Sequence, residues 1–303
     1  MINSNFVTGV VLANASMDIA LHDTFYQMAI IPLFSVTGLA LIAPKHLSQD
    51  NLAAFTVGLI DGDGSLQVNH WQRKSLQYRL IVKLAHKPYN LEMLSRIAAV
   101  YRGKVRVVLN KRTGVETVQW TIDDSYIIKT VIVPLLTQYP PLTSRVALQL
   151  AFVIKALNGM TMDEYFSSIK GKYDDRLISP VSANNYPSYF GSWLSGFIEA
   201  EGSFSIRNTK NVITFSVSQL NDLYLIDAIR AFFNQNHLTI SAKTQKSGKI
   251  LYELSVGSLN GITAVIKHCQ PLLQGYKYVQ LAEFVHKVQA LDNLRELFWY
   301  KQK

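Results

Sequence analysis

Two stretches of this sequence share one pattern of apolar and polar positions. The first reads FTVGLIDGDGSLQV from Phe55, and the second reads SWLSGFIEAEGSFSI from Ser192. In each, apolar residues first recur at helical spacing; after a glycine, the period changes to two, as in a half-buried strand. Each stretch therefore predicts a helix that runs directly into a strand. Glycine ends each helix, at Gly64 and Gly202, where we expect left-handed backbone.

The segments that follow these two stretches also repeat. A second strand is predicted over residues 77–85 and 212–219, and a helix over residues 89–101 and 222–234. Two further strands and two further helices complete each unit. Landmarks in the first unit lie five or six residues further apart, which we attribute to one insertion in the first hairpin. The sequence thus predicts an α+β fold with two units of the same plan.

The repeat sets the expected domain boundaries. The first domain spans residues 45–157 and the second spans 188–303, while residues 158–187, rich in Gly, Ser, Asn, Asp and Pro, predict a linker. Residues 1–44 precede the repeat as an extension. Within it, residues 26–43 are almost uncharged and reach the lower limit of membrane-spanning length, but no basic segment of a signal peptide precedes them.

Composition narrows the classes of partner. With 49% hydrophobic and 17% charged residues, the chain has the makings of packed cores and not of general disorder. Its net charge of +9 favours an anionic partner, either nucleic acid or a membrane surface, although a basic protein without such a partner stays an alternative. Cys269 is the sole cysteine, which excludes an intrachain disulfide and a cysteine-based zinc cluster.

Small residues recur four apart in both repeated helices: Gly58 with Gly62, and Gly196 with Ala200. Residues at this spacing share a helix face, and without bulk there two helices can approach closely. We therefore expect the two helices to pair and form the interface between the domains. Packing inside each domain is the alternative use of the same residues.

Each repeated helix ends on a carboxylate, Asp63 in the first and Glu201 in the second. Negative charge at a helix C-terminus opposes the helix dipole and costs about 0.3–1 kcal/mol. Pairing the helices would add repulsion between the two acids, and a divalent cation would relieve it. Carboxylate, water and phosphate oxygens are the ligands that Mg²⁺ prefers. The pattern predicts a metal site, with ordinary solvated helix ends as the alternative.

Polar side chains occupy the strand face opposite to the predicted core. Amides, hydroxyls and guanidinium groups can read base edges in the major groove, while Lys and Arg hold phosphates. A solvated sheet face would have a similar composition, so the pattern predicts a DNA-binding surface without fixing any single contact. The residues are Gln67, Asn69, Gln77, Arg79, Lys83, Lys104, Arg106, Thr117 and Gln119 in the first half, and Ser203, Ser205, Arg207, Ser216 and Ser218 in the second.

The segments VGLIDGDG and LSGFIEAEG resemble the LAGLIDADG motif, and the chain resembles two-motif, single-chain LAGLIDADG homing endonucleases over about residues 52–291. It departs from the motif at Thr56, Val57, Gly62 and Ser195, and by having Glu at both acidic positions of the second copy. The resemblance implies a monomer with pseudo-twofold symmetry. Two four-stranded antiparallel sheets would form a saddle in the DNA major groove, with the motif helices paired at the interface.

The resemblance also implies roles for individual residues. In the family the last acid of each motif binds the metal ions, which points to Asp63 and Glu201, and the preceding carbonyls, here of Gly62 and Ala200, assist. A basic and a polar residue lie near each scissile phosphate; the matching positions are Lys277, Arg145 and Gln219. His86 falls opposite Gln219 in the first half. Because it departs from the family's glutamine, a strand-end histidine without a catalytic role is the simpler interpretation.

The activity implied is site-specific double-strand cleavage of DNA during intron homing. The reaction would be metal-dependent phosphodiester hydrolysis that leaves 3′ overhangs, with Mg²⁺ as cofactor, Mn²⁺ as a substitute and no small-molecule substrate. An RNA maturase that assists splicing of its host intron, alone or as a second activity, is the alternative. Intact Asp63 and Glu201 favour the nuclease, because splicing assistance alone would need neither acid.

Residues 8–26 resemble part of cytochrome c oxidase subunit I, and the likeness stops near Gln27. This implies an intron reading frame fused to its upstream exon, encoded and made in the mitochondrion. The expected target is then the intronless oxidase subunit I gene. Residues 26–43 are either an exon–intron junction without function or a membrane span. A membrane fragment of the oxidase would account for residues 8–43 and for nothing after them.

Overall fold

The computed structural model describes residues 44–174, 181–183, 185–207 and 212–290. The chain divides into two units, residues 1–42 and 43–303, and the fold described below is that of the second. The extension resembling an oxidase exon and the apolar stretch 26–43 lie outside the described residues. Among the described helices, none combines the length and the apolar character needed to cross a membrane.

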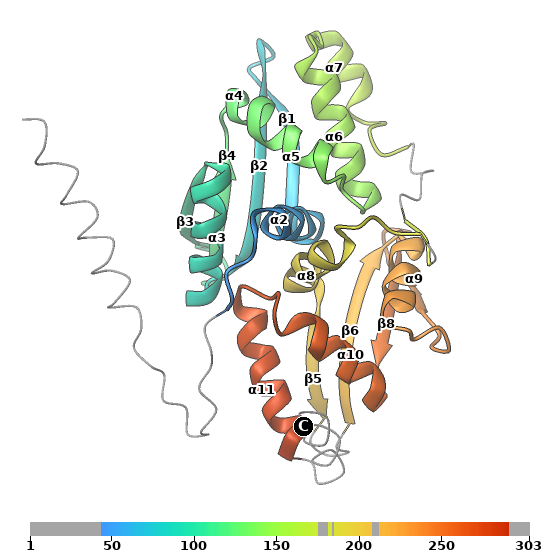
Figure 1. Cartoon of the computed structure of the whole chain (residues 1–303). Helices are drawn as coiled ribbons and strands as arrows, with labels where there is room; N and C mark the ends of the chain where they lie inside the picture. Colours follow the sequence, from blue (N-terminus) through green and yellow to red (C-terminus); the bar gives the residue numbers. More distant parts are fainter. Residues whose placement is uncertain (1–43, 175–180, 184, 208–211, 291–303) are drawn as a thin grey trace, which may run out of the picture. The chain divides into compact units, whose positions relative to one another are not determined.

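Each half contains a four-stranded antiparallel sheet (Figure 1). The first has the order β1-β2-β4-β3 and the second the equivalent order β5-β6-β8-β7. The matching order confirms the predicted α+β repeat. The strands are β1 (Gly64–Trp71), β2 (Ser75–Ala85), β3 (Lys104–Leu109), β4 (Glu116–Ile122), β5 (Ser203–Arg207), β6 (Val212–Leu220), β7 (Ser241–Thr244) and β8 (Ile250–Val256).

The repeated motif helices α2 and α8 pack against each other and join the two halves (Figure 1). The first half contains α2 (Gln49–Asp63), α3 (Pro88–Tyr101), α4 (Ser125–Ile127), a π-helical turn η1 (Ile128–Ile132), α5 (Val133–Gln138), α6 (Ser144–Leu157) and α7 (Met162–Ser168). The second half contains α8 (Phe190–Glu201), α9 (Leu223–Phe232), α10 (Leu259–Cys269) and α11 (Tyr276–Ala290).

Glycine allows α2 and α8 to touch backbone to backbone. A Cβ atom at Gly58 would lie 1.9 Å from the carbonyl oxygen of Trp193, and one at Gly196 would lie 1.9 Å from that of Phe55. The two contacts involve equivalent positions, so the interface follows the pseudo-twofold relation between the halves. Any side chain at either glycine would push the helices apart. The prediction that these small residues form the domain interface is confirmed.

The prediction of left-handed backbone at Gly64 and Gly202 is wrong. Both residues are extended, with φ −89° and ψ 161° at Gly64, and φ −72° and ψ 150° at Gly202. Glycine is needed for space instead: a Cβ atom would lie 2.5 Å from the carbonyl oxygen of Ile60 in the first case and 2.7 Å from that of Ile198 in the second. The chain can therefore turn straight from each motif helix into its strand.

Alternate strand positions supply the two cores. In the first sheet, α3 contacts β4 and α6 contacts β1; in the second, α9 contacts both β6 and β8. The inward side chains are the apolar ones that the period of two predicts. The buried strand residues include Leu66, Val68, Leu80, Val82, Val118 and Trp120 in the first half, and Ile213, Phe215, Val217, Leu254 and Val256 in the second.

The segment predicted as a linker, residues 158–187, contains a helix that the sequence analysis missed. A capping box between Thr161 and Glu164 starts α7. The buried Tyr165 packs this helix on the first hairpin, and its hydroxyl donates to the carbonyl of Val68 over 3.2 Å. The capping pattern Thr-x-x-Glu is visible in the sequence and was the signal available for this helix.

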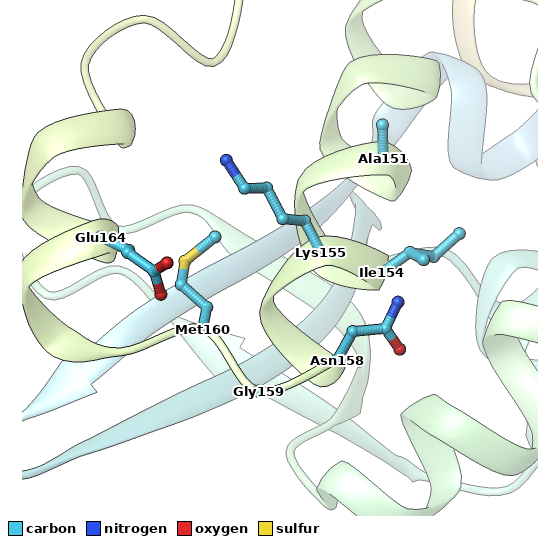
Figure 2. A pocket seen from close by; sticks show the side chains of 7 residues that line it. All are labelled: Ala151, Ile154, Lys155, Asn158, Gly159, Met160 and Glu164. Carbon is cyan, nitrogen blue, oxygen red and sulfur yellow. The ribbon is translucent and has the colours of Figure 1, made fainter.

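A shallow pocket lies where α6 meets α7 (Figure 2). Its lining mixes aliphatic, amide and charged side chains, including Ile154, Lys155, Asn158, Met160 and Glu164. None of the predicted site residues belongs to it. The candidate chemistry lies elsewhere, at the C-terminal ends of α2 and α8.

Candidate active site

The C-terminal ends of α2 and α8 meet. A Cβ atom at Gly62 would lie 2.3 Å from the Cβ of Ala200 and 3.3 Å from the Cγ of Glu201. Asp63 is the last residue of α2 and Glu201 the last of α8. The structure thus brings together the four residues predicted as metal ligands, two through their carboxylates and two through the preceding carbonyls.

The two carboxylates share one electrostatic environment. Burial, and next the negative charge of Glu201, raise the pKa of Asp63 to about 7, while Lys277 and Arg145 act to lower it. Burial also raises the pKa of Glu201, against the opposing charges of Arg145 and Lys277. The residue Asp63 nonetheless keeps an exposed surface, so the site is open to a ligand. The two predicted acids and two predicted cations therefore lie within reach of one another's charge.

Arg145 closes the end of α2. It is the second residue of α6, and its guanidinium donates to the carbonyls of Gly64 and Asp61, each over 2.6 Å, and of Gly62 over 2.9 Å. Carbonyls at a helix C-terminus lack partners within the helix, and positive charge is favourable there. Arg145 is therefore fixed at the C-terminal end of α2, the helix whose last residue is Asp63.

Lys277 holds the equivalent position in the second half, as the second residue of α11. Burial lowers the pKa of its ammonium group, while the charges of Glu199, Asp63 and Glu201 act to raise it. Arg145 and Lys277 are equivalent residues, because each is the second residue of the corresponding helix.

Two further acids, Asp61 in α2 and Glu199 in α8, occupy equivalent positions and had no predicted role. The carboxylate of Asp61 is fully buried and accepts hydrogen bonds from the backbone N–H groups of Leu142 (2.7 Å) and Thr143 (3.2 Å) and from the Thr143 hydroxyl (2.5 Å). Burial raises its pKa to about 6, although these hydrogen bonds act to lower it. Asp61 thereby anchors the loop that leads into Arg145.

Glu199 does the same in the second half. Its buried carboxylate accepts from the backbone N–H groups of Gln274 (3.3 Å), Gly275 (3.1 Å) and Lys277 (2.8 Å). Burial raises its pKa against these bonds and against the charge of Lys277. The signal in the sequence was an acid repeated in both motif helices, two residues before the last acid and therefore on nearly the opposite side of the helix.

Strand register identifies equivalent residues in the two sheets and corrects the predicted insertion. Ser65 pairs with Ile81, sixteen residues later, whereas the equivalent Ser203 pairs with Ser216, thirteen residues later. The first hairpin is therefore longer by three residues, not by five or six. The remaining difference arises between β2 and α6.

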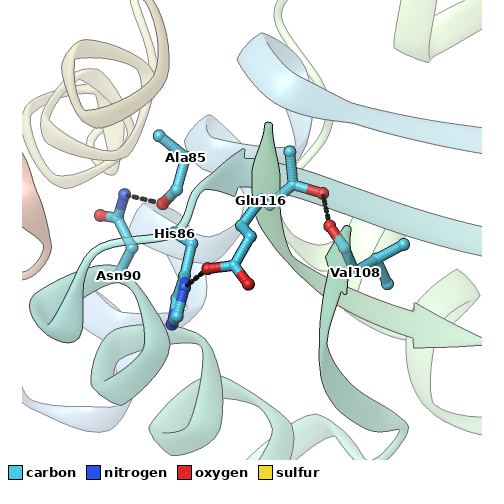
Figure 3. Close-up of polar contacts among 6 residues, drawn as sticks. Ala85, His86, Asn90, Val108 and Glu116 are labelled. Atoms are coloured by element: carbon cyan, nitrogen blue, oxygen red, sulfur yellow. Dashed lines mark hydrogen bonds and ion pairs between the residues drawn. The ribbon is translucent and has the colours of Figure 1, made fainter. Parts of the chain in front are cut away.

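This register also changes the counterpart of Gln219. Ile81 of β2, the partner of Ser65, is equivalent to Ser216 of β6, the partner of Ser203. Counting three residues onward from each places Leu84, and not His86, at the position of Gln219. Gln219 is buried on the core face of β6. His86 lies just beyond β2, with its Nδ1 2.8 Å from a carboxylate oxygen of Glu116 (Figure 3). This ion-pair partner agrees with an ordinary histidine at a strand end.

The predicted binding residues of the first half share one face of its sheet. Cross-strand neighbours lie on the same face, and Gln67 pairs with Arg79, Asn69 with Gln77, Lys83 with Gln119, and Gln119 with Arg106. Lys104 and Thr117 follow the same alternation. The charged side chains are exposed, and Arg79 pairs with Asp123. The face is polar and basic.

The second sheet presents hydroxyl groups where the first presents cations. Ser203 pairs with Ser216, Ser205 with Thr214, and Ser218 with Glu253. Ser203 and Ser205 are exposed, while Ser216 and Ser218 are partly exposed. Arg207 pairs with Val212 through its backbone, but its side chain lies outside the described structure. Register therefore puts all five predicted positions on one face.

Known proteins are similar to this chain in both sequence and fold. The sequence profile described as LAGLIDADG endonuclease matches residues 56–155 and 194–288, one match in each half. The chain belongs to the LAGLIDADG endonuclease family. It is 32% identical to a probable intron-encoded endonuclease aI3 of Debaryomyces hansenii over 92% of its own length and 48% of that protein. A protein of the same name from Dictyostelium citrinum is 34% identical over 70% of this chain and 86% of the relative.

Solved LAGLIDADG structures have the same architecture. The meganuclease I-CpaMI bound to uncleaved DNA aligns with 77% of this chain and 90% of its own, with a TM-score of 0.58 and 18% identity. I-SmaMI bound to an uncleaved DNA target in the presence of calcium ions aligns with 82% of this chain and 93% of its own, with a TM-score of 0.56 and 14% identity.

The comparisons confirm the predicted family and the two-domain fold. The relatives' names identify intron-encoded endonucleases, and one from Saccharomyces cerevisiae, 25% identical over 84% of this chain, is an intron-encoded DNA endonuclease. These names do not favour the maturase alternative. The chain spans about half the length of the Debaryomyces relative, so target and metal are matters for proposal.

Proposed function

We propose that this chain makes a site-specific double-strand break in DNA by metal-dependent hydrolysis, in the service of intron homing. The observation that carries the proposal is the meeting of the two motif-helix ends. There, Asp63 and Glu201 lie within one another's field, each accompanied by a cation at the start of a following helix. Two acids and two cations at the symmetry axis suit one phosphodiester on each strand.

The site fits a hard divalent cation such as Mg²⁺. Burial and the neighbouring Glu201 raise the pKa of Asp63 to about 7. A bound divalent cation would favour the ionised form of this carboxylate. Among the described residues no three His, Cys, Asp or Glu side chains converge as a complete cage. The two carboxylates and two carbonyls supply only part of a coordination shell. Water and phosphate oxygens would complete it, as is usual for Mg²⁺. Mn²⁺ would take the same ligands.

The ligands proposed are the carboxylates of Asp63 and Glu201, with the carbonyls of Gly62 and Ala200 assisting. A bound metal ion stabilises charge on the attacking and leaving oxygens of a phosphodiester. Arg145 already donates to the Gly62 carbonyl, and it would share its donors between that carbonyl and a phosphate. Cleavage across the minor groove leaves 3′ overhangs.

Lys277 and Gln219 complete the proposed second site. Lys277 would stabilise negative charge on the phosphate as a compact cation on a flexible stem. Gln219 would orient the reacting groups through its amide. Its counterpart by register is Leu84, which has no polar group, so the two strands would be cut at sites of unequal composition.

The exposed sheet faces would lie against double-stranded DNA, bound by one monomer. Cations of the first face, Lys83, Lys104 and Arg106, suit phosphates, while its amides suit adenine edges. The serine-rich second face offers hydroxyls that accept or donate at any base edge. Each residue predicted from the sequence thus retains a proposed contact with DNA.

The proposed target is the intronless gene for cytochrome c oxidase subunit I. The likeness of residues 8–26 to that subunit supports it, as does the name intron-encoded endonuclease borne by the relatives. Synthesis inside the mitochondrion follows from the same origin, and one relative from Saccharomyces cerevisiae is named a mitochondrial protein.

The test is cleavage of a DNA fragment that spans the intron insertion point, by the purified full chain with and without Mg²⁺. We expect one double-strand break. Asp63→Asn and Glu201→Gln should each leave nicking of a single strand or abolish cutting, while Glu283→Gln, which changes an exposed helical acid, should cut like the wild type. Tight binding of the intron RNA without cleavage of DNA in Mg²⁺ or Mn²⁺ would overturn the proposal in favour of the maturase.

A further inference from the structure

An acid of the second half caps the helix that carries Arg145 in the first. The carboxylate of Asp222 accepts from the backbone N–H of Ser144 over 2.9 Å and from its hydroxyl over 2.5 Å. Ser144 is the first residue of α6 and directly precedes Arg145. Asp222 is 2% exposed, so the contact is buried between the halves. Negative charge at the first turn of α6 also suits the helix dipole.

Asp222 stands at the N-cap of its own helix, α9, yet its side chain makes no capping hydrogen bond there. Aspartate is a preferred N-cap because its carboxylate normally accepts from the next turn of its own helix. Here the carboxylate serves a helix of the other half instead. From the start of the same helix, the Tyr224 hydroxyl donates to the carbonyl of Leu142 over 2.8 Å, in the loop before α6.

The second site is held in an equivalent way by the first half. The side-chain oxygen of Asn90, in the first turn of α3, accepts from the N–H of Tyr276 over 2.8 Å. Tyr276 is the first residue of α11 and precedes Lys277. Arg96 of α3 donates to the carbonyl of Gln274 over 3.3 Å, as Tyr224 does to the preceding loop of the first site. In each site, one residue from the opposite half thus holds the start of the cationic helix and a second holds the loop before it.

We propose that Asp222 and Asn90 are positioning residues that act across the interface: each fixes the first turn of the helix whose next residue is the cation of the other half's site. Within its own half, the same loop is anchored by Asp61 or Glu199. Each cation is therefore placed by both halves at once. This inference rests on the proposed function. It predicts that loss of one positioning residue slows the cleavage of one DNA strand and not of the other.

The arrangement predicts which site is affected when one positioning residue is lost. Loss of Asp222 loosens the start of α6 and hence Arg145, but leaves the start of α11 and Lys277 untouched. A displacement of about 1 Å at a catalytic group can cost about a hundredfold in rate. A merely structural role of Asp222 would lower stability and slow both strands alike.

The experiment measures single-turnover cleavage of each strand, with the two strands of the oxidase-gene fragment labelled separately and the full chain in excess with Mg²⁺. Asp222→Ala should slow one strand by about tenfold or more and leave the other within about twofold. Asn90→Ala should slow the opposite strand. Asp222→Asn should restore the rate, because its amide offers an oxygen to the Ser144 N–H and a donor to the Ser144 hydroxyl. Equal slowing of both strands by Asp222→Ala would overturn the proposal.

A double-mutant comparison identifies the route of the effect. If Asp222 acts through Arg145, then adding Asp222→Ala to Arg145→Ala should slow that strand no further. A full additional loss in the double variant would also overturn the proposal.

Amide hydrogen exchange on the full chain without DNA separates this inference from the proposed function. Asp222→Ala should speed exchange in residues 142–148 and not in 274–280, and Asn90→Ala should do the reverse. Absence of cutting by the wild type would refute the proposed function, while the exchange pattern would still decide whether the helices are held across the interface. Unchanged exchange in both segments would refute the inference even if the wild type cuts DNA.

Discussion

The indole Nε1 of Trp193 donates a hydrogen bond to the carboxylate of Asp61 over 2.8 Å, from α8 to α2 across the domain interface. The same carboxylate accepts from the backbone of Leu142, in the loop before α6. One buried acid therefore connects the partner motif helix to the helix that carries Arg145. The equivalent residue of α2 is Phe55, which has no donor, so this connection belongs to one half only.

Trp193→Phe tests the strength of that connection. The ring of Trp193 stacks on Phe197 with centroids 4.9 Å apart, and phenylalanine would preserve most of this packing. A hydrogen bond to a buried charged acceptor contributes about 1.5–3 kcal/mol, so we expect the free energy of unfolding to fall by about that much. Trp120→Phe is the matched control, because the indole of Trp120 donates to the neutral carbonyl of Arg102 over 2.7 Å. Equal losses in urea unfolding of the two variants would contradict the expectation.

Gly58→Ala tests the contact between the motif helices. Its Cβ atom would lie 1.9 Å from the backbone oxygen of Trp193, which no side-chain rotation can relieve. We expect the unfolding free energy to fall by about 3 kcal/mol or more, and both strands to be cut more slowly. Gly191→Ala in α8 is the control, because its Cβ atom would come no closer than 3.7 Å to its neighbours, and alanine is a better helix former. Thermal unfolding in which both variants behave alike would count against the close contact.

Much of the architecture could be predicted because it depends on local patterns. The change from a helical period to a period of two set the motif helix and first strand of each half, and alternation set the exposed face. The small residues at Gly58 and Gly196 indicated the interface because the same spacing of small residues occurs in both motif helices, which favours close approach of the two. These features follow from the spacing of residues near one another in the chain.

What could not be predicted depends on contacts between distant segments. The roles of Asp61 and Glu199 come from loops about 80 and 75 residues later in the chain, whose backbone N–H groups no sequence period marks. The counterpart of Gln219 was misassigned because strand pairing, and not residue count, decides which positions are equivalent. The glycine at position 64 is needed because a side chain there would collide with Ile60, a reason that the sequence alone does not reveal.

Lys83→Ala tests the basic sheet face. Lys83 is exposed on β2, opposite Gln119 and on the face that we propose lies against DNA. If it contacts a phosphate, its loss should weaken binding and reduce the slope of log affinity against log salt by about 0.9. Lys129→Ala is the matched control, because this lysine is exposed on η1, which contacts β2 from the helical layer. Fluorescence anisotropy at several salt concentrations measures both slopes, and an equal change in the two variants would argue against this face.

His268 gives the second half a dependence of stability on pH. Its Nε2 lies 3.1 Å from the hydroxyl of Ser195, and its ring packs edge-on against Phe232 and Phe233. Burial lowers its pKa from 6.5 to about 4. The folded state therefore resists protonation, whereas an unfolded histidine takes up a proton near pH 6.5. Its contribution to stability is complete above that pH and is lost as the pH falls toward 4.

We expect the unfolding free energy of the wild type to fall by about 2–3 kcal/mol between pH 7.5 and 4.5 relative to that of His268→Gln, whose amide can still bond to Ser195. The comparison must be a difference, because the raised pKa of Asp61 acts in the opposite sense: its protonation favours the folded state as the pH falls through about 6. Asp61 is present in both proteins, so its effect cancels. Urea unfolding across this range measures the difference, and parallel curves for the two proteins would show that His268 takes up its proton without unfolding.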